Sequence, residues 1–226
     1  MPRANAVRLR IGELAGVIAP PLLFAVLALG TILEWHDIRS LGWSASRRSD
    51  VEWPSVLLLG HLGWLVAACF VLIGALGMLF AAYVIDNAEC AYGRLIGVLI
   101  FVIGLAVALE AFRPDRPRTG EASSWHDQIH NYVYPAIPIA AVLAAALVAG
   151  HAARRGARGT RALALVSVAA VVMIAAGIGL GFDGSVAQIA RYLLIGSLVV
   201  WLEAFALYVR RPQGLTRQRS SRTNVA

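Results

Sequence analysis

The sequence contains no lysine, and its 20 lysine and arginine residues are all arginines. A protein without lysine cannot form a Schiff base through a lysine side chain or use a lysine as a general base. Charged residues are also few, at 15% of the chain, whereas a typical soluble domain has about 25%. The sequence therefore excludes lysine-based catalysis and is poor in charge for a soluble domain.

Cysteine is nearly absent as well. Cys69 lies in an apolar stretch and Cys90 in a short polar one, so the two are not expected to meet. The sequence therefore predicts neither a disulfide framework nor a cysteine metal site. The net charge of +7 could suggest nucleic acid, but the arginines cluster at the ends of apolar stretches, as the loop charges of membrane proteins do. We predict membrane lipids as partners and no nucleic-acid binding.

Apolar residues make up 59% of the chain and lie in long stretches, each close to the ~20 residues that cross a bilayer. The six stretches cover residues 11–33, 55–85, 93–112, 131–151, 162–182 and 186–209. A backbone in lipid has no water to bond with, so each stretch is predicted to be a helix. The sequence predicts an all-α, integral membrane six-helix bundle over residues 1–212 and a disordered, arginine-rich tail over 213–226.

Prolines and arginines add detail to this topology. Prolines within the first and fourth stretches, including Pro20 and Pro135, are expected to kink those helices. Three arginine clusters fall on one side of the bundle: Arg3, Arg8 and Arg10; Arg154, Arg155, Arg158 and Arg161; Arg210, Arg211, Arg217, Arg219 and Arg222. Because cytoplasmic loops carry excess arginine, both termini are predicted to be cytoplasmic. The protein is predicted to span the inner (plasma) membrane, with loops 34–54 and 113–130 outside.

The polar stretch "SSWHDQIHNY" begins at residue 123, just before the fourth apolar stretch. Ser124 followed by Asp127 resembles a capping box, which predicts a helix beginning near Trp125. His126 and His130 would then lie one turn apart on the same helix face.

Further ionisable residues are expected at a similar depth, near the outer ends of other helices. They are His61, Glu110, Arg113, Asp115 and Arg191. An ionisable group within a membrane span costs several kcal/mol unless it is paired. We therefore predict an outward-facing polar site built from these residues and the two histidines, and expect Arg191 to pair with a group near it such as Asp183.

The run "EAFRPDRPRTGEASSWHDQIHN", residues 110–131, resembles the signature of a bacterial and archaeal membrane family, domain of unknown function 998. The matching residues are Phe112, Pro114, Asp115, His126 and His130. The first outer loop and the six-helix layout are also similar to that family. Asp127 stands where the family commonly has glycine. The resemblance implies the fold and carries no activity with it.

A metal site is one interpretation of the polar residues. Catalytic zinc takes three protein ligands and a water, and His126, His130 and His61 could be those ligands. Asp115 or Glu110 would be the catalytic general base or a further ligand.

In this interpretation, the metal-bound water would hydrolyse an ester or amide of an outer-leaflet lipid. Arg113 or Arg191 would bind the phosphate or carboxylate of this substrate.

Non-enzymatic interpretations remain open on the same residues. His126 with Asp115, and His130 with Glu110, could be hydrogen-bonded pairs that fix loop 113–130 to the bundle. The protein would then be a transporter, a lipid-binding protein or an accessory membrane protein. Haem would need histidines that face each other across the bundle. The oligomeric state stays open.

Overall fold

The computed structural model describes residues 2–45, 52–115, 123–155, 158–180 and 187–210, so the predicted tail over 213–226 lies outside the described residues. The described residues form eight α-helices and one 3-10 helix, η1. These are α1 (Pro2–Leu33), α2 (Trp35–Ser40), η1 (Ser55–Leu59), α3 (Gly63–Asp86), α4 (Ala91–Leu109), α5 (Trp125–Val133), α6 (Ala136–Arg155), α7 (Arg158–Leu180) and α8 (Ala187–Arg210).

Six segments are long and apolar enough to cross a membrane. They are Val7–Leu33, Gly63–Asp86, Ala91–Leu109, Trp125–Arg154, Thr160–Leu180 and Gln188–Arg210. The fourth segment combines α5 and α6. The predicted all-α, six-helix membrane bundle is therefore confirmed, while the side on which the termini lie stays a prediction.

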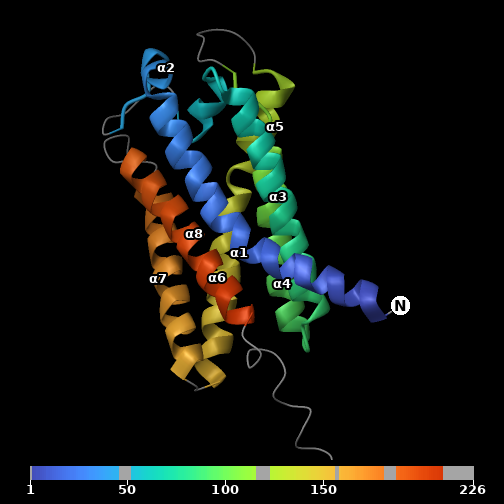
Figure 1. Ribbon diagram of the computed structural model, residues 1–226. Helices are drawn as coiled ribbons and strands as arrows, with labels where there is room; N and C mark the ends of the chain where they lie inside the picture. Colours follow the sequence, from blue (N-terminus) through green and yellow to red (C-terminus); the bar gives the residue numbers. More distant parts are fainter. Residues whose placement is uncertain (1, 46–51, 116–122, 156–157, 181–186, 211–226) are drawn as a thin grey trace, which may run out of the picture.

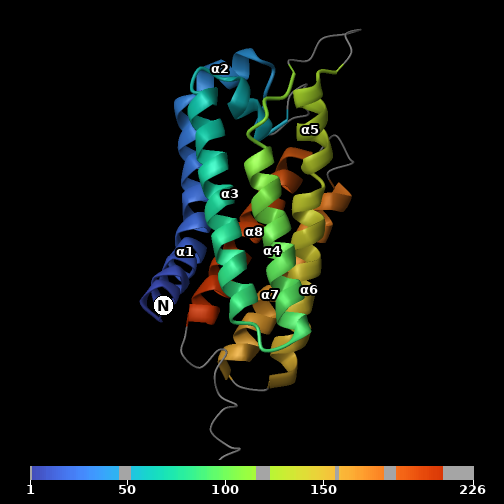
Figure 2. The same ribbon diagram turned by 90° about the vertical axis from the view of Figure 1, so that its right-hand side faces the viewer.

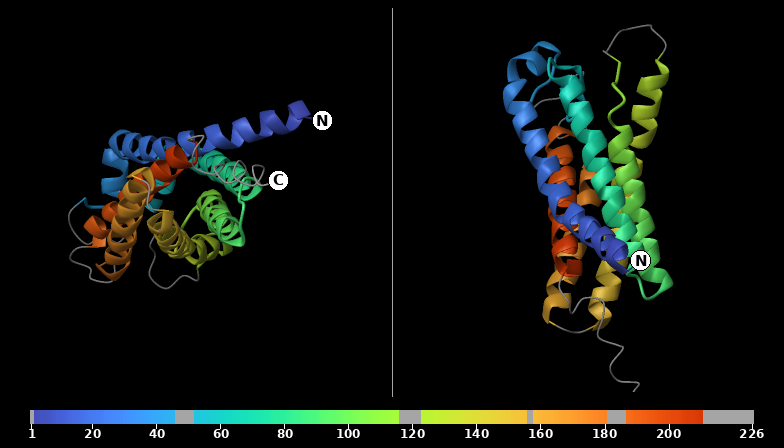
Figure 3. Two further views of the ribbon diagram at one scale, coloured as in Figure 1. Left: turned by 90° about the horizontal axis from the view of Figure 1, so that it is seen from below. Right: turned by 45° about the vertical axis from the view of Figure 1, so that its right-hand side comes forward.

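The six long helices run side by side (Figures 1 and 2), and their contacts close a ring. α3 packs between α1 and α4, α6 packs between α4 and α7, and α8 packs against both α7 and α1. Seen from below, the helices surround a common axis, and the first turns of α1 extend away from it (Figure 3). α1 runs unbroken through Pro20 and Pro21 and changes direction along its length (Figure 1). We call the end of the ring where α2, η1 and α5 lie the α2 end.

Two of the predicted helices are interrupted near the α2 end. The second stretch begins as η1, and the chain then breaks over residues 60–62 before α3 starts at Gly63. The fourth stretch divides into α5 and α6 at Tyr134 and Pro135, because proline has no N–H to continue the helical bonding. Both breaks fall where polar side chains are concentrated.

Glu34, between α1 and α2, fills the first of these breaks. It is 2% exposed, and its carboxylate accepts hydrogen bonds from the backbone N–H groups of His61, at 2.8 Å, and of Leu62. A Cβ on Gly60 would collide with this carboxylate. A buried anion at the start of a helix satisfies N–H groups that have no partner within the helix. Glu34 therefore fixes the start of α3, although the sequence suggested only a loop charge.

α3 and α4 cross at glycines. A Cβ on Gly104 would lie 2.9 Å from the carbonyl oxygen of Gly74, and a Cβ on Gly74 would lie 2.5 Å from that of Gly104. Small residues let helices in lipid approach closely. This crossing brings α4 close to α3, and Glu110 directly follows the last residue of α4.

Candidate functional site

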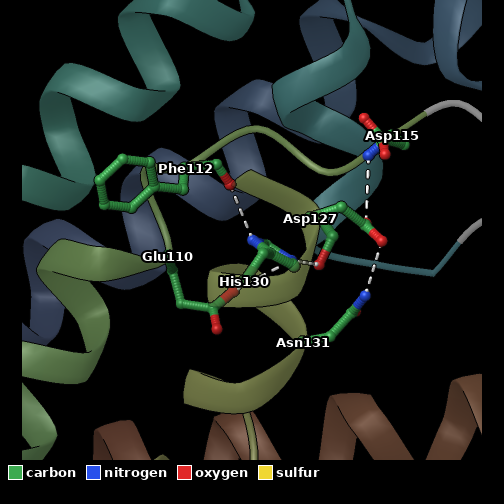
Figure 4. Close-up of polar contacts among 7 residues, drawn as sticks. Glu110, Phe112, Asp115, Asp127, His130 and Asn131 are labelled. Atoms are coloured by element: carbon green, nitrogen blue, oxygen red, sulfur yellow. Dashed lines mark hydrogen bonds and ion pairs between the residues drawn. The ribbon is translucent and has the colours of Figure 1, made fainter. Parts of the chain in front are cut away.

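The start of α5 is built as its sequence predicts. The backbone N–H of Asp127 donates to Ser124 Oγ at 3.3 Å, and the helix begins at Trp125. The Asp115 carboxylate accepts from the Ser124 N–H at 2.6 Å and from its hydroxyl at 2.8 Å. Asp127 Oδ1 in turn accepts from the Asp115 N–H at 3.1 Å (Figure 4). Asp115 and Asp127 thus join the end of the segment after α4 to the start of α5.

His130 is the most buried polar residue of α5, at 3% exposed. Its Nδ1 lies 2.9 Å from the carbonyl oxygen of Phe112, and since a carbonyl only accepts, Nδ1 carries a proton. Its Nε2 lies 2.7 Å from Ser55 Oγ and 3.2 Å from Glu110 Oε2. One imidazole therefore links α5 to η1 and to the end of α4 (Figure 4).

Glu110, the residue after α4, is 6% exposed. Burial raises the pKa of Glu110 to about 8, because the charged carboxylate loses its hydration. Its Oε2 faces His130, whereas its Oε1 is buried and has no hydrogen-bond partner among the described residues. The predicted His130–Glu110 pair is present, and it leaves one carboxyl oxygen unused.

A cavity of about 370 Å³ lies beside this pair at the α2 end. We call it the polar cavity. Its described lining residues are Glu52, Trp53, Ser55, Val56, Leu59, Pro114, Asp115, Asp127, His130, Asn131 and Tyr134. Three of these carry carboxylates and none is an arginine. The polar part of the lining therefore offers carboxylate acceptors, beside the apolar residues Trp53, Val56, Leu59 and Pro114.

A second cavity, of about 50 Å³, lies on the ring axis. We call it the axial cavity. It is lined by Leu23, Leu27, Pro54, Phe70, Val107, Glu110, Tyr134, Ile137, Pro138, Leu194, Ile195 and Leu198. Tyr134 lines both cavities. A third cavity of about 40 Å³ shares Leu23, Val107 and Leu198 with the axial cavity, so the two apolar cavities are neighbours.

The two arginines predicted to bind substrate have protein partners. Arg191, whose side chain is 14% exposed, forms an ion pair with Glu52 and lies near Tyr134. Arg113 Nη2 lies 3.3 Å from the carbonyl oxygen of Leu59. Asp183, the partner expected for Arg191, lies outside the described residues. Both arginines thus hold parts of the α2 end together.

The other two histidines of the predicted metal site are not at the polar cavity. His61 is exposed and lies in the break before α3. His126 is exposed, and its ring stacks on Trp125 with centroids 3.6 Å apart. Among the described residues, no group of three or more His, Cys, Asp or Glu side chains could hold a metal ion. The structure therefore does not bring the three imidazoles together.

Glu52, Ser55, Asn131 and Tyr134 line the polar cavity and were missed by the sequence analysis. The sequence held a signal for Asn131 and Tyr134. Asn131 lies four residues after Asp127, and Tyr134 four residues after His130, so both are expected on the same helix face as these residues. Ser55 and Glu52 carry no such pattern. Only the folded chain brings the start of η1 beside α5.

A ring of six helices long enough to cross a bilayer, with a polar cavity at one end, defines a multi-pass membrane protein. The family of proteins of unknown function DUF998 matches residues 17–208, and the chain belongs to it. The resemblance predicted from residues 110–131 is thereby confirmed. Comparison with curated proteins and with solved structures found no match.

Proposed function

We propose that the protein binds a membrane amphiphile and places its head group in the polar cavity, without hydrolysing it. The observation that carries this proposal is the contact of two unlike cavities at Tyr134. One is lined by carboxylate, hydroxyl and imidazole groups, and the other almost wholly by hydrocarbon. A molecule with a polar head and an apolar chain matches both, because each of its parts is placed in surroundings of its own polarity.

The charge of the polar cavity indicates the class of head group. Glu52, Asp115 and Asp127 contribute carboxylates to the lining, and the ion pair with Arg191 offsets the charge of Glu52 alone. Acceptors and negative charge favour a head group with an amine and hydroxyl donors over a phosphate. This proposal differs from the sequence-based expectation that Arg113 and Arg191 bind an anionic group.

A metal-dependent hydrolase receives less support. Three protein ligands are needed for catalytic zinc, and the described residues provide no such group. His130, the remaining candidate ligand, uses both ring nitrogens in contacts with Phe112, Ser55 and Glu110. The non-enzymatic lipid-binding interpretation is therefore the one we propose.

We also propose that the polar cavity faces the outside of the plasma membrane. The support is the distribution of arginines, since the clusters around Arg8, Arg154 and Arg210 lie at the opposite end of the ring from α2. Positive charge is enriched on the cytoplasmic side of membrane proteins. The bound amphiphile would then come from the outer leaflet.

Binding of a defined probe tests the proposed function. The probe is a long-chain 2-amino-1,3-diol, titrated into the detergent-purified protein and followed by native mass spectrometry. Its 1-phosphate, which has the same chain and an anionic head, is the comparison ligand. We expect the amino diol to bind at least about tenfold more tightly, a difference of about 1.4 kcal/mol.

Two tryptophan variants locate the binding site. Asn131→Trp places a large side chain in the mouth of the polar cavity. Tyr132→Trp changes the next residue, which is 81% exposed and does not line the cavity. We expect the first variant to weaken binding and the second to leave it unchanged. Equal affinity in both variants, or tighter binding of the phosphate, would contradict the proposal.

A further inference from the structure

We infer that the axial cavity is the second half of the ligand site, and that Glu110 Oε1 accepts a hydrogen bond from a hydroxyl group next to the ligand's head. This inference rests on the proposed function and adds a requirement to it. The ligand would be a single-chain amphiphile with a hydrogen-bond donor where head and chain meet.

The first argument is the unused oxygen. Glu110 is more than nine-tenths buried and lines the axial cavity, and its Oε1 has no partner among the described residues. A buried acceptor without a partner is unfavourable, and a donor on the ligand would remove this cost.

The second argument concerns which hydrogen-bonding role Oε1 has. When Glu110 is protonated, the proton is best placed on Oε2, because Oε2 faces His130 Nε2 at 3.2 Å. When Glu110 is ionised, both of its oxygens are acceptors. Oε1 is therefore an acceptor in either state and selects a donor from the ligand.

The third argument is that a water molecule fits the axial cavity poorly. Buried waters make about three hydrogen bonds each, and one water needs about 10–15 Å³. The axial cavity is larger, at about 50 Å³, and its only lining side chains with polar groups are Glu110 and Tyr134. A ligand with a donor on its hydrocarbon chain would bond to Oε1 and pack against the apolar lining.

The position of Glu110 agrees with a continuous ligand. Its Oε2 contacts His130, which lines the polar cavity, while the residue itself lines the axial cavity. Beyond it, the third cavity borders the axial cavity, because Leu23, Val107 and Leu198 line both. A head group beside His130 would thus place the first carbons of its chain at Glu110.

A matched pair of ligands tests this inference. The long-chain 2-amino-1,3-diol is compared with its 3-deoxy analogue, which has the same amine, terminal hydroxyl and chain but lacks the hydroxyl at the junction. Both are titrated into the purified protein under the same conditions. We expect wild type to bind the 3-deoxy analogue at least about tenfold more weakly, because a hydrogen bond to a buried acceptor is lost.

Two substitutions at Glu110 separate the acceptor from the carboxyl group. Glu110→Gln keeps an oxygen towards the axial cavity and can donate to His130 Nε2, so the tenfold preference should remain. Glu110→Leu keeps the volume but removes the acceptor, so the two ligands should bind with equal affinity. Thermal unfolding of each variant confirms that it is folded.

The outcomes distinguish this inference from the proposed function. If wild type binds both ligands equally and Asn131→Trp weakens both, the head-group site stands and the role of Glu110 Oε1 is refuted. If the preference for the hydroxyl survives in a folded Glu110→Leu variant, the inference is likewise overturned. If wild type binds neither ligand and Asn131→Trp changes nothing, the proposed function itself fails.

Discussion

Replacing His130 by phenylalanine should destabilise the protein strongly, because one imidazole joins three segments of the α2 end. Its ring nitrogens contact the carbonyl oxygen of Phe112, the hydroxyl of Ser55 and the carboxyl of Glu110. Phenylalanine fills a similar volume but makes none of these hydrogen bonds. The loss of stability therefore reports the lost hydrogen bonds and not the opening of a cavity.

The magnitude follows from the groups that lose their partner. The carbonyl of Phe112 and Oε2 of Glu110 would be left buried without His130, while the hydroxyl of Ser55 can rotate to another acceptor. Each buried polar group without a partner costs about 1–3 kcal/mol. We expect His130→Phe to lower the free energy of unfolding by about 2–6 kcal/mol.

Unfolding in mixed detergent micelles, followed by tryptophan fluorescence, measures this loss. The matched control is His126→Phe, one turn earlier, where the ring is exposed and stacks on Trp125. The control should change stability by less than about 0.5 kcal/mol. The double variant with Glu110→Leu should lose about 0.5–3 kcal/mol less than the sum of the single losses, because these residues contact each other. Equal stability of the His130 and His126 variants would refute the reasoning.

Three further outcomes follow from the structure and are measured by the same unfolding assay. Glu34→Gln should cost about 1.5–3 kcal/mol, because an amide nitrogen replaces one charged acceptor of the N–H groups before α3; a loss below 0.5 kcal/mol would contradict this role. Gly104→Ala should cost about 1–3 kcal/mol, because its Cβ would press on the backbone of α3, and an unchanged stability would show that the helices can separate freely. Burial raises the pKa of Glu110 from 4.5 to about 8, so the folded state holds this proton more tightly than the unfolded state. The free energy of unfolding should therefore fall as pH rises between these values, by at most about 1.4 kcal/mol per pH unit, and Glu110→Gln should remove this slope.

The sequence predicted the membrane bundle well because long apolar stretches leave few structural alternatives in lipid. It also predicted the start of α5, since Ser124 and Asp127 form a local hydrogen bond across three residues. The contact between His130 and Glu110 was among the pairs considered. These features depend on local spacing or on position at the end of a helix.

The sequence could not show which histidines share a site. His61 was expected about two turns inside a continuous helix, but the break over residues 60–62 leaves it exposed. That break is held by Glu34, which lies 27 residues earlier in the chain. The partner of Arg191 was similarly hidden, because Glu52 is 139 residues away. Contacts between residues so far apart in the sequence depend on how the helices pack together, and the hydropathy of the sequence does not predict that packing.

The ring closes between α1 and α8, two helices separated by most of the chain. During synthesis, the side of α1 that packs against α8 would therefore have no helix against it until α8 has been inserted in the bilayer. The space on the ring axis has no complete wall before that moment, since Leu194 and Leu198 of α8 supply part of it. Binding of the proposed amphiphile would therefore have to follow the insertion of α8.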